Sequence, residues 1–178
     1  HAKRVAAIES VWVSTDDLEI ADIALSEGAR VIKRPPELAT DEATTDAALV
    51  HGVGKIRSSG RDPRIVVTLQ PTTPFRQTHT IEDCIAACPS FTAYDQWQYD
   101  WTDGYPYTEG RLRRQERAPR IIEDGSVYAT LVDELMATGS RVSPESRPIV
   151  HLGAAYHLEI DAPRDYALAV AIQNDYDL

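Results

Sequence analysis

Residues 64–76 read RIVVTLQPTTPFR, and this stretch decides the fold. Its first half, Ile65–Leu69, is a short β-branched run, which is typical of a strand buried on both faces of a parallel sheet. Its second half contains two prolines, which cannot continue a central strand, so the chain must leave the sheet at Gln70. Ligands of open α/β sheets bind where loops leave the carboxyl ends of strands, so Gln70 and Arg76 are the first polar candidates. An ordinary loop between a strand and a helix would explain the same pattern.

The composition limits the classes of protein to consider. The chain has 178 residues, which favours a single domain, and its 43% hydrophobic residues are enough for a packed core. A formal net charge of −10 argues against general binding to nucleic acid or to anionic membranes. No apolar run has transmembrane length and no signal-peptide pattern opens the chain, so we expect a cytoplasmic protein. Cys84 and Cys88 lack nearby histidines and suit buried apolar positions better than a zinc site or a disulfide framework.

The alternation of elements predicts an α/β fold. Residues 11–13 predict a strand, 18–25 a helix with an apolar face, and 29–32 a second strand, which together form the unit of a parallel sheet. Ile65–Leu69 is expected near the middle of that sheet, with Val66 and Val67 almost fully buried. Further elements are expected as helices over 46–58, 80–88 and 131–137, strands over 126–130, 147–150 and 156–160, and a closing helix after Pro163. Residues 2–8 resemble the end of a helix, so we expect a segment upstream of His1.

The middle of the chain has a different character. Residues 91–110 hold two tryptophans and four of the eight tyrosines without a clear periodicity. They would form either a surface lid or an arm that covers its aromatic side chains against a partner chain. Residues 111–120 contain five arginines, which in so acidic a chain create a positive field suited to an anionic ligand. A solvated loop that compensates its own charges would have the same composition. We therefore expect residues 91–128 to act as a dimerisation or lid segment.

An acidic pair ends the last predicted strand. Alternation along a strand places Glu159 and Asp161 on one face, where two carboxylates can hold Mg²⁺ beside phosphate oxygens. Asp161 also lies just before Pro163, a favourable first residue of a helix, so helix capping is its competing role. The five histidines are dispersed and none has the spacing of metal ligands. No convincing Ser/His/Asp or Cys/His set is present, so covalent catalysis is not expected.

Several motifs occur together in the order seen in one family. They are VSTDD followed by IADIALSEGA, then RPPELATDEATT, LQPTTPFR, RRQ with EDGSVY, and EIDAPRDY. Over nearly the whole chain they resemble the acylneuraminate cytidylyltransferases, the CMP-sialic acid synthetases and their relatives. The resemblance implies a single domain with a doubly wound, mostly parallel sheet like that of nucleotide-diphospho-sugar transferases, and a homodimer in which an arm of one subunit helps close the other's site. It also implies that CTP and a nonulosonic sugar acid react to give the CMP-sugar and pyrophosphate, with Mg²⁺ as cofactor.

The resemblance further implies roles for individual residues. The nucleotide pocket of the family corresponds to Arg34, Asp41, Ala43 and Thr45. The sugar side corresponds to Gln70, Arg114, Gln115 and Tyr128. The acidic pair that holds the metal corresponds to Glu159 and Asp161. Among these, Asp161 and Arg114 are the residues that the family pattern indicates for catalysis.

Three departures from the family pattern leave alternatives open. The family's opening strand and its glycine- and lysine-containing phosphate loop, which would grip the triphosphate through backbone N–H groups, have no counterpart in the sequence. Asp124 stands where the family usually has Asn. Asp100 lies in a segment where members of the family often have a basic residue near the same position. One alternative is a non-catalytic or truncated relative that serves as a dimerising or binding module. The other is a cytidylyltransferase for another sugar acid or for a phosphonate.

Overall fold

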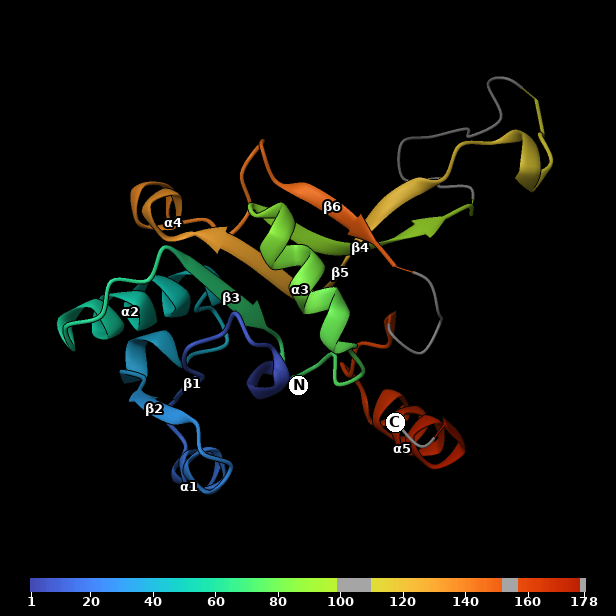
Figure 1. The fold of residues 1–178 in the computed structure, drawn as a ribbon. Coiled ribbons are helices and arrows are strands. Elements are labelled where there is room, and N and C mark those ends of the chain that lie inside the picture. Colours follow the sequence, from blue (N-terminus) through green and yellow to red (C-terminus); the bar gives the residue numbers. More distant parts are fainter. Residues whose placement is uncertain (99–109, 152–156, 177–178) are drawn as a thin grey trace.

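The computed structural model describes residues 1–98, 110–151 and 157–176, and its strands form two sheets (Figure 1). A small parallel sheet contains β1 (Trp12–Thr15) and β2 (Arg30–Lys33). The larger sheet has the order β3-β5-β4-β6. Its strands are β3 (Ile65–Leu69), β4 (Ser90–Gln96), β5 (Arg120–Leu131) and β6 (Arg147–Val150). The α/β class that the sequence predicted is confirmed.

Strand β5 alone runs against the others in the larger sheet. It pairs in antiparallel fashion with β3 and with β4, whereas β4 and β6 pair in parallel, so β3, β4 and β6 share one direction. Because three of the four strands run in the same direction, the prediction of a mostly parallel sheet is confirmed. The predicted central place of β3 is wrong, because β5 occupies the middle and β3 forms an edge within the described residues. Val66 and Val67 are accordingly half-buried and not almost fully buried.

Five helices and three single turns of 3₁₀-helix complete the described residues. The helices are α1 (Leu18–Ser26), α2 (Thr45–Ser58), α3 (Thr78–Ala87), α4 (Val132–Thr138) and α5 (Pro163–Tyr176). The 3₁₀ turns are η1 (Ala2–Arg4), η2 (Pro36–Leu38) and η3 (Arg114–Glu116). Side chains begin two of the helices, because Asp17 accepts a hydrogen bond from the Ile20 backbone and Thr44 from that of Ala47.

The structure differs from the sequence-based expectations near both ends of the chain. Near its start, Ala2–Arg4 form a single 3₁₀ turn, and residues 5–8 form no helix. Residues 157–161 form no strand, and Tyr156, where the predicted strand begins, lies outside the described residues. Residues 158–161 follow an irregular path towards Pro163, where α5 begins.

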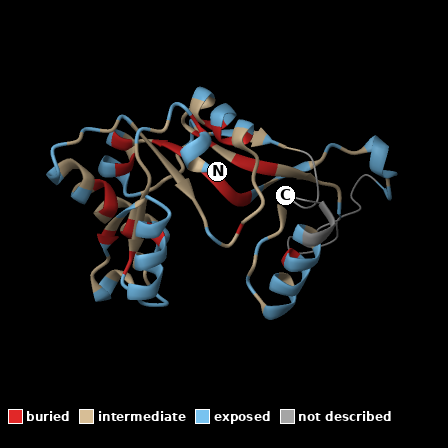
Figure 2. Cartoon of the chain, turned by 60° about the horizontal axis from the view of Figure 1, so that its bottom comes forward, coloured by how far each residue is buried: buried red, intermediate tan, exposed pale blue. Residues whose placement is uncertain are grey.

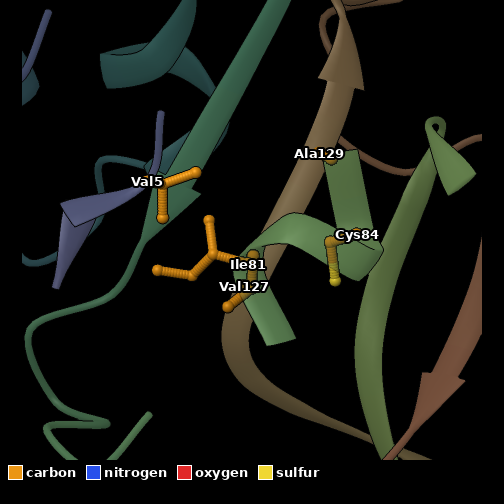
Figure 3. Packing of buried hydrophobic residues seen from close by; sticks show 5 residues of the cluster. All are labelled: Val5, Ile81, Cys84, Val127 and Ala129. Carbon is orange, nitrogen blue, oxygen red and sulfur yellow. The ribbon is translucent and has the colours of Figure 1, made fainter. Parts of the chain in front are cut away.

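The main core lies between helix α3 and the larger sheet. Ile81 and Cys84 of α3 meet Val127 and Ala129 of β5, with Val5 beside them (Figure 3). A second cluster on α2, α4 and the other face of β3 contains Val53, Val132, Leu135 and Val66. Figure 2 shows that burial is concentrated on the central strands, whereas the outer helices are largely exposed. The interpretation of Cys84 as a buried apolar residue is confirmed, and burial raises the pKa of its thiol to about 11.

Helix α1 does not bury the apolar face that its sequence predicted. Its Leu18, Ile20, Ile23 and Leu25 side chains are each more than half exposed, and only Ala24 is buried. The helix therefore contacts β1 and β2 through a narrow strip of small side chains. Among the helices of residues 1–98, 110–151 and 157–176, none combines the length and the apolar character needed to cross a membrane.

Gly125 creates an irregularity in the middle of β5. Phe91 and Ala93 are two residues apart on β4, but their partners Tyr128 and Glu123 are five residues apart on β5. The additional residues of β5 include Gly125, whose φ of +73° lies in the left-handed region that side chains disfavour. The strand expected over 126–130 is therefore part of a longer continuous strand, Arg120–Leu131, that contains a bulge.

We expect Gly125→Ala to destabilise the fold by roughly 1–3 kcal/mol, the usual cost of an unfavourable backbone conformation. The new Cβ would also meet the Oε1 atom of Gln70 well inside van der Waals contact. Gly54→Ala is the matched control, because Gly54 lies in helix α2 with no atom within 4 Å of the added carbon. That control should stabilise the helix by about 0.5–1 kcal/mol. Urea unfolding of both variants measures the two effects, and equal stability of the two would contradict the expectation.

Candidate active site

Three segments meet where β3 ends. The Gln70 side chain follows β3 and reaches Gly125. A Cβ added at Gly125 would lie 3.7 Å from Oε1 of Glu159, so the Glu159 carboxylate is also near this glycine. The Ile160 backbone N–H donates to the carbonyl of Thr72 (2.8 Å), which holds the acidic segment beside the loop. We call Gln70, Gly125 and Glu159 the Gly125 junction. The structure thus brings together a predicted sugar-side residue and a predicted metal ligand.

Arg76 has a structural part in this junction. Its guanidinium donates to the carbonyl of Gln70, to the carbonyl of Thr73 (2.5 Å) and to the hydroxyl of Thr73 (2.9 Å). Burial lowers the pKa of Arg76 to about 10, with a smaller opposing effect from Asp124. Arg76 is therefore still charged at neutral pH, and it fixes the loop that carries Gln70 by satisfying carbonyl groups that would otherwise lack donors.

Glu159 and Asp161, the acidic pair, lie close enough to interact although they are not on a strand. Partial burial raises the pKa of Glu159, and the negative charges of Asp161 and Asp124 add to that rise. Both members of the pair are exposed, so a cation could reach their oxygens from solvent. Like charges in such proximity are stabilised when a cation binds between them.

Asp161 does not cap helix α5. Asp165 supplies the cap, because its carboxylate accepts from the backbone N–H of Ala162 (2.8 Å) and of Asp161 (3.2 Å). Within the described residues, the Asp161 carboxylate itself accepts no hydrogen bond that would compete with a ligand. Capping, which the sequence offered as the competing role of Asp161, is therefore wrong.

The residues expected around a nucleotide lie between β2 and α2. Arg34 follows β2 and donates to the carbonyl (2.5 Å) and the hydroxyl (3.2 Å) of Ser14 at the end of β1. Asp41 is exposed and Ala43 half-buried, and Thr45 is the first residue of α2. These residues therefore belong to the small sheet and to the connection that follows it.

Tyr128 lies in the interior, where it has no surface to offer a substrate. It is 2% exposed, and its hydroxyl donates to the Glu123 carboxylate. Burial and the neighbouring Glu123 raise the pKa of Tyr128. The guanidinium of Arg141 lies 4.5 Å from the centre of the ring and binds Asp46 of α2 (2.6 Å). Through Arg141, Tyr128 thus connects the sheet to the start of α2. No sequence pattern indicated Arg141 as its partner.

Arg114 and Gln115 lie on an arm, which consists of the end of β4, turn η3 and the start of β5. Figure 1 shows the arm projecting from the sheet, with η3 far from the end of β3. One chain therefore does not bring Arg114 and Gln115 to the Gly125 junction. Arg114 lies 4.3 Å from the centre of the Trp97 ring, and the two residues line a hollow of about 280 Å³ with Asp95 and Gln98.

Other arginines of the arm are compensated locally. Arg113 pairs with Glu116, and Arg117 donates to the carbonyl groups of Trp97 and Gln98. The arm is shorter than the expected segment 91–128, because Ala93 and Val127 are buried in the sheet. The remaining aromatic residues that motivated the arm, Tyr99, Trp101, Tyr105 and Tyr107, lie outside the described residues.

Asp124, His151 and His157 form a cluster that the sequence did not predict. The Asp124 carboxylate accepts hydrogen bonds from His151 (2.6 Å) and His157 (3.3 Å), although the spacing of the histidines gave no such signal. The pairing of β4 with both β5 and β6 brings Asp124 and His151 together, and His157 joins them against the ring of Tyr94. We call Asp124, His151 and His157 the histidine cluster.

Comparisons with known proteins agree with this architecture. The N-acylneuraminate cytidylyltransferase A of Danio rerio is 26% identical over 181 residues, which cover 90% of this chain and 40% of that protein. The CMP-N,N'-diacetyllegionaminic acid synthase of Legionella pneumophila is 26% identical over 184 residues, covering 94% of this chain and 79% of that protein. A shorter match, 43% identical over 75 residues, covers 42% of this chain and 17% of the N-acylneuraminate cytidylyltransferase of Escherichia coli.

Solved structures share the fold. A CMP:2-keto-3-deoxy-manno-octonic acid synthetase complexed with CTP superposes with a TM-score of 0.64 at 17% identity, covering 99% of this chain and 85% of that chain. The 2-C-methyl-D-erythritol 4-phosphate cytidylyltransferase of Thermus thermophilus gives 0.54 at 14% identity, covering 97% and 85% respectively. At these identities the likeness concerns the fold alone.

The resemblance that the ordered motifs indicated is thus confirmed. A family model described as cytidylyltransferase matches residues 1–99, which is more than half of the 178 residues. The chain therefore belongs to the cytidylyltransferase family.

Proposed function

We propose that this chain transfers CMP from CTP to the anomeric hydroxyl of a nonulosonic sugar acid. The hydroxyl oxygen attacks the α-phosphorus of CTP, the bond from that phosphorus to the bridging oxygen breaks, and pyrophosphate leaves as the hydroxyl proton is lost. The observation that carries the proposal is the meeting of Gln70 and Glu159 at Gly125, with Asp161 beside them. A sugar hydroxyl and a charged phosphate both find partners in such a junction.

The names of the relatives support the substrate class. The relatives from Danio rerio and Escherichia coli are named for N-acylneuraminate, and the Legionella pneumophila relative for N,N'-diacetyllegionaminic acid. These are nonulosonic acids, whereas the octonic acid synthetase resembles this chain in fold at lower identity. The sequence likeness therefore favours a nonulosonic acid over an octulosonate or a phosphonate.

Glu159 and Asp161 fit a magnesium ion. Their oxygens are hard ligands, their like charges favour a cation, and Asp165 leaves the Asp161 carboxylate unused by the helix. Bound together with the nucleotide, Mg²⁺ would neutralise charge on the phosphate oxygens. Two carboxylates alone bind Mg²⁺ weakly, so we expect occupancy only when nucleotide phosphate is also present.

The sugar acid would be held by donors and acceptors of this chain. The Gln70 amide can donate to one hydroxyl and accept from another. An arginine such as Arg114 can bind the sugar carboxylate through two parallel charge-assisted bonds. Catalysis then depends mainly on positioning and on charge neutralisation, since no covalent nucleophile is needed.

We propose that Arg114 serves the junction of a second copy of the chain. Arg114 is exposed in turn η3 of the arm, which projects away from the end of β3 of the same chain (Figure 1). A two-fold dimer would place the arm of each subunit at the partner's site, since its interface repeats the same surface on both copies. The stacking of Arg114 on Trp97 would orient the guanidinium at the end of the arm.

Asp161→Asn should reduce turnover at least roughly 100-fold in the full-length protein, because a metal-ligand charge supplies several kcal/mol to the transition state. The fold should persist, since the side chain makes no cap. Asp165→Asn is the control, because an amide oxygen can still accept the capping bonds and turnover should be retained. Pyrophosphate release measures both, and unchanged activity of Asp161→Asn would show that this carboxylate holds no catalytic metal.

Arg114→Lys and Gln70→Ala should each weaken use of the sugar acid far more than use of CTP. Loss of a charged hydrogen-bond pair corresponds to about 2–4 kcal/mol, or roughly thirty- to a thousand-fold in kcat/KM. Arg113→Lys is the control, because Arg113 is already paired with Glu116. Kinetics with each substrate varied separately tests the assignment. A raised KM for CTP with an unchanged KM for the sugar acid would contradict this assignment, because it would place these residues in the nucleotide half of the site.

A mixture of two inactive variants should recover activity if the sites are shared. In a shared site, Asp161 comes from one subunit and Arg114 from the other. A heterodimer of Arg114→Ala and Asp161→Asn therefore has one site with both residues intact and one site with both replaced. Random mixing of equal amounts should give about a quarter of the wild-type activity, because half of the dimers are mixed. Sedimentation at micromolar concentration should show a dimer. A monomer, or a mixture as inactive as its parts, would contradict the shared site.

A further inference from the structure

The histidine cluster brings three distant segments to one point beside strand β4. Asp124 lies at the bulge of β5, next to Gly125. His151 follows β6, and its backbone N–H donates to the carbonyl of Ala93 (3.1 Å). His157 lies against the ring of Tyr94, with the ring centres 4.7 Å apart, and against His151 at 4.8 Å. Each member is therefore held by the sheet or by a neighbouring ring.

The two oxygens of Asp124 have different surroundings. Oδ1 accepts from the Thr92 hydroxyl and from the Ser126 backbone N–H (3.0 Å). Oδ2 faces the imidazoles, with His151 Nε2 at 2.6 Å and His157 Nδ1 at 3.3 Å. Donors that bind one carboxylate oxygen and leave the other facing histidine nitrogens are the outer shell typical of a metal ligand.

The carboxylate is nearly enclosed and the imidazoles are not. The Asp124 side chain is 1% exposed, whereas those of His151 and His157 are 13% and 17% exposed. An ion could therefore reach the three ligand atoms from the histidine side and keep a water molecule there. A fully buried carboxylate facing two nitrogens also gains from a cation, because burial leaves its charge poorly solvated.

We propose that Asp124, His151 and His157 form a binding site for a divalent transition-metal ion such as Zn²⁺. This site is separate from the acidic pair, Glu159 and Asp161. Their ligand atoms all lie within 4.8 Å of one another. Tetrahedral zinc with bonds of about 2.0–2.1 Å separates its ligand atoms by about 3.3 Å. The distance from Asp124 Oδ2 to His157 Nδ1 already has this value, 3.3 Å. The shorter contact to His151 would open by about 0.7 Å when the ion replaces the shared proton.

The ligand types distinguish the ion from Mg²⁺. Imidazole nitrogens suit zinc and its neighbours, whereas Mg²⁺ takes oxygen ligands and water. Three protein ligands leave a fourth position for water on the exposed side. His157 lies two residues before Glu159, so a bound ion would fix the segment that leads to the acidic pair. We therefore assign the ion a positioning role.

Direct titration of the full-length protein with Zn²⁺ tests the proposal. Calorimetry should show one tight site per chain, and a thermal melt should show a higher Tm with Zn²⁺. His151→Ala and His157→Ala should each weaken binding at least roughly tenfold, the scale on which even outer-shell partners act. His79→Ala is the matched control, because His79 is exposed on helix α3 away from the cluster. Excess Mg²⁺ should not displace the zinc.

Two further measurements keep the test decisive if an alanine variant fails to fold. Asp124→Asn keeps the size of the side chain and should lose the zinc-dependent rise in Tm. Crystals soaked with Co²⁺ should show anomalous scattering between the three ligand atoms. The proposal is overturned if zinc binds equally to the wild type and to the folded His157 or Asp124 variants, if His79→Ala abolishes binding, or if the anomalous signal lies elsewhere.

Discussion

The pairing of strand β5 on both of its edges is the interaction on which the rest of the structure depends. It joins β3 to β4, and its left-handed residue Gly125 changes which face the following side chains occupy. Asp124, just before the glycine, binds the histidines, and Val127 and Ala129, after it, pack in the core under α3. The absence of a side chain at 125 lets Gln70 approach. One backbone conformation thus sets the position of the whole junction.

One buried and two half-buried charged side chains lie near β5, and each has partners of its own. Arg76 binds carbonyls of the loop after β3, Asp124 binds donors from β4 and two histidines, and Arg141 binds Asp46. Breaking a buried pair costs far more than forming it gains, because the remaining charge is left without solvent. These contacts therefore act mainly on geometry, by holding loops and helix starts at fixed distances around the site.

Local patterns predicted most elements, because caps and β-branched runs act over a few residues. Asp17 and Thr44 cap the helices expected over 18–25 and 46–58, and Ile65–Leu69 is a strand. The place of that strand in the sheet was not readable, since strand order depends on pairing between distant residues. The strand patterns already singled out Gln70 and Glu159, the family resemblance supplied their specific roles, and the fold brings them together. The histidine cluster could not be predicted, because its members meet only through long-range contacts: the pairing of β4 with β5 and β6, and the packing of His157 against Tyr94.

The separation of the strands into two sheets has a consequence for how the molecule opens. The small sheet and α1 bury little apolar surface, because the large side chains of that helix are mostly exposed. Regions with few buried contacts open locally at a lower free energy than the core of the same protein. Arg34 follows β2 of the small sheet, which should open more easily, whereas Gln70 follows β3 of the larger sheet. A nucleotide bound to Arg34 would therefore slow amide exchange in the small sheet by mass action, while the larger sheet would exchange as before.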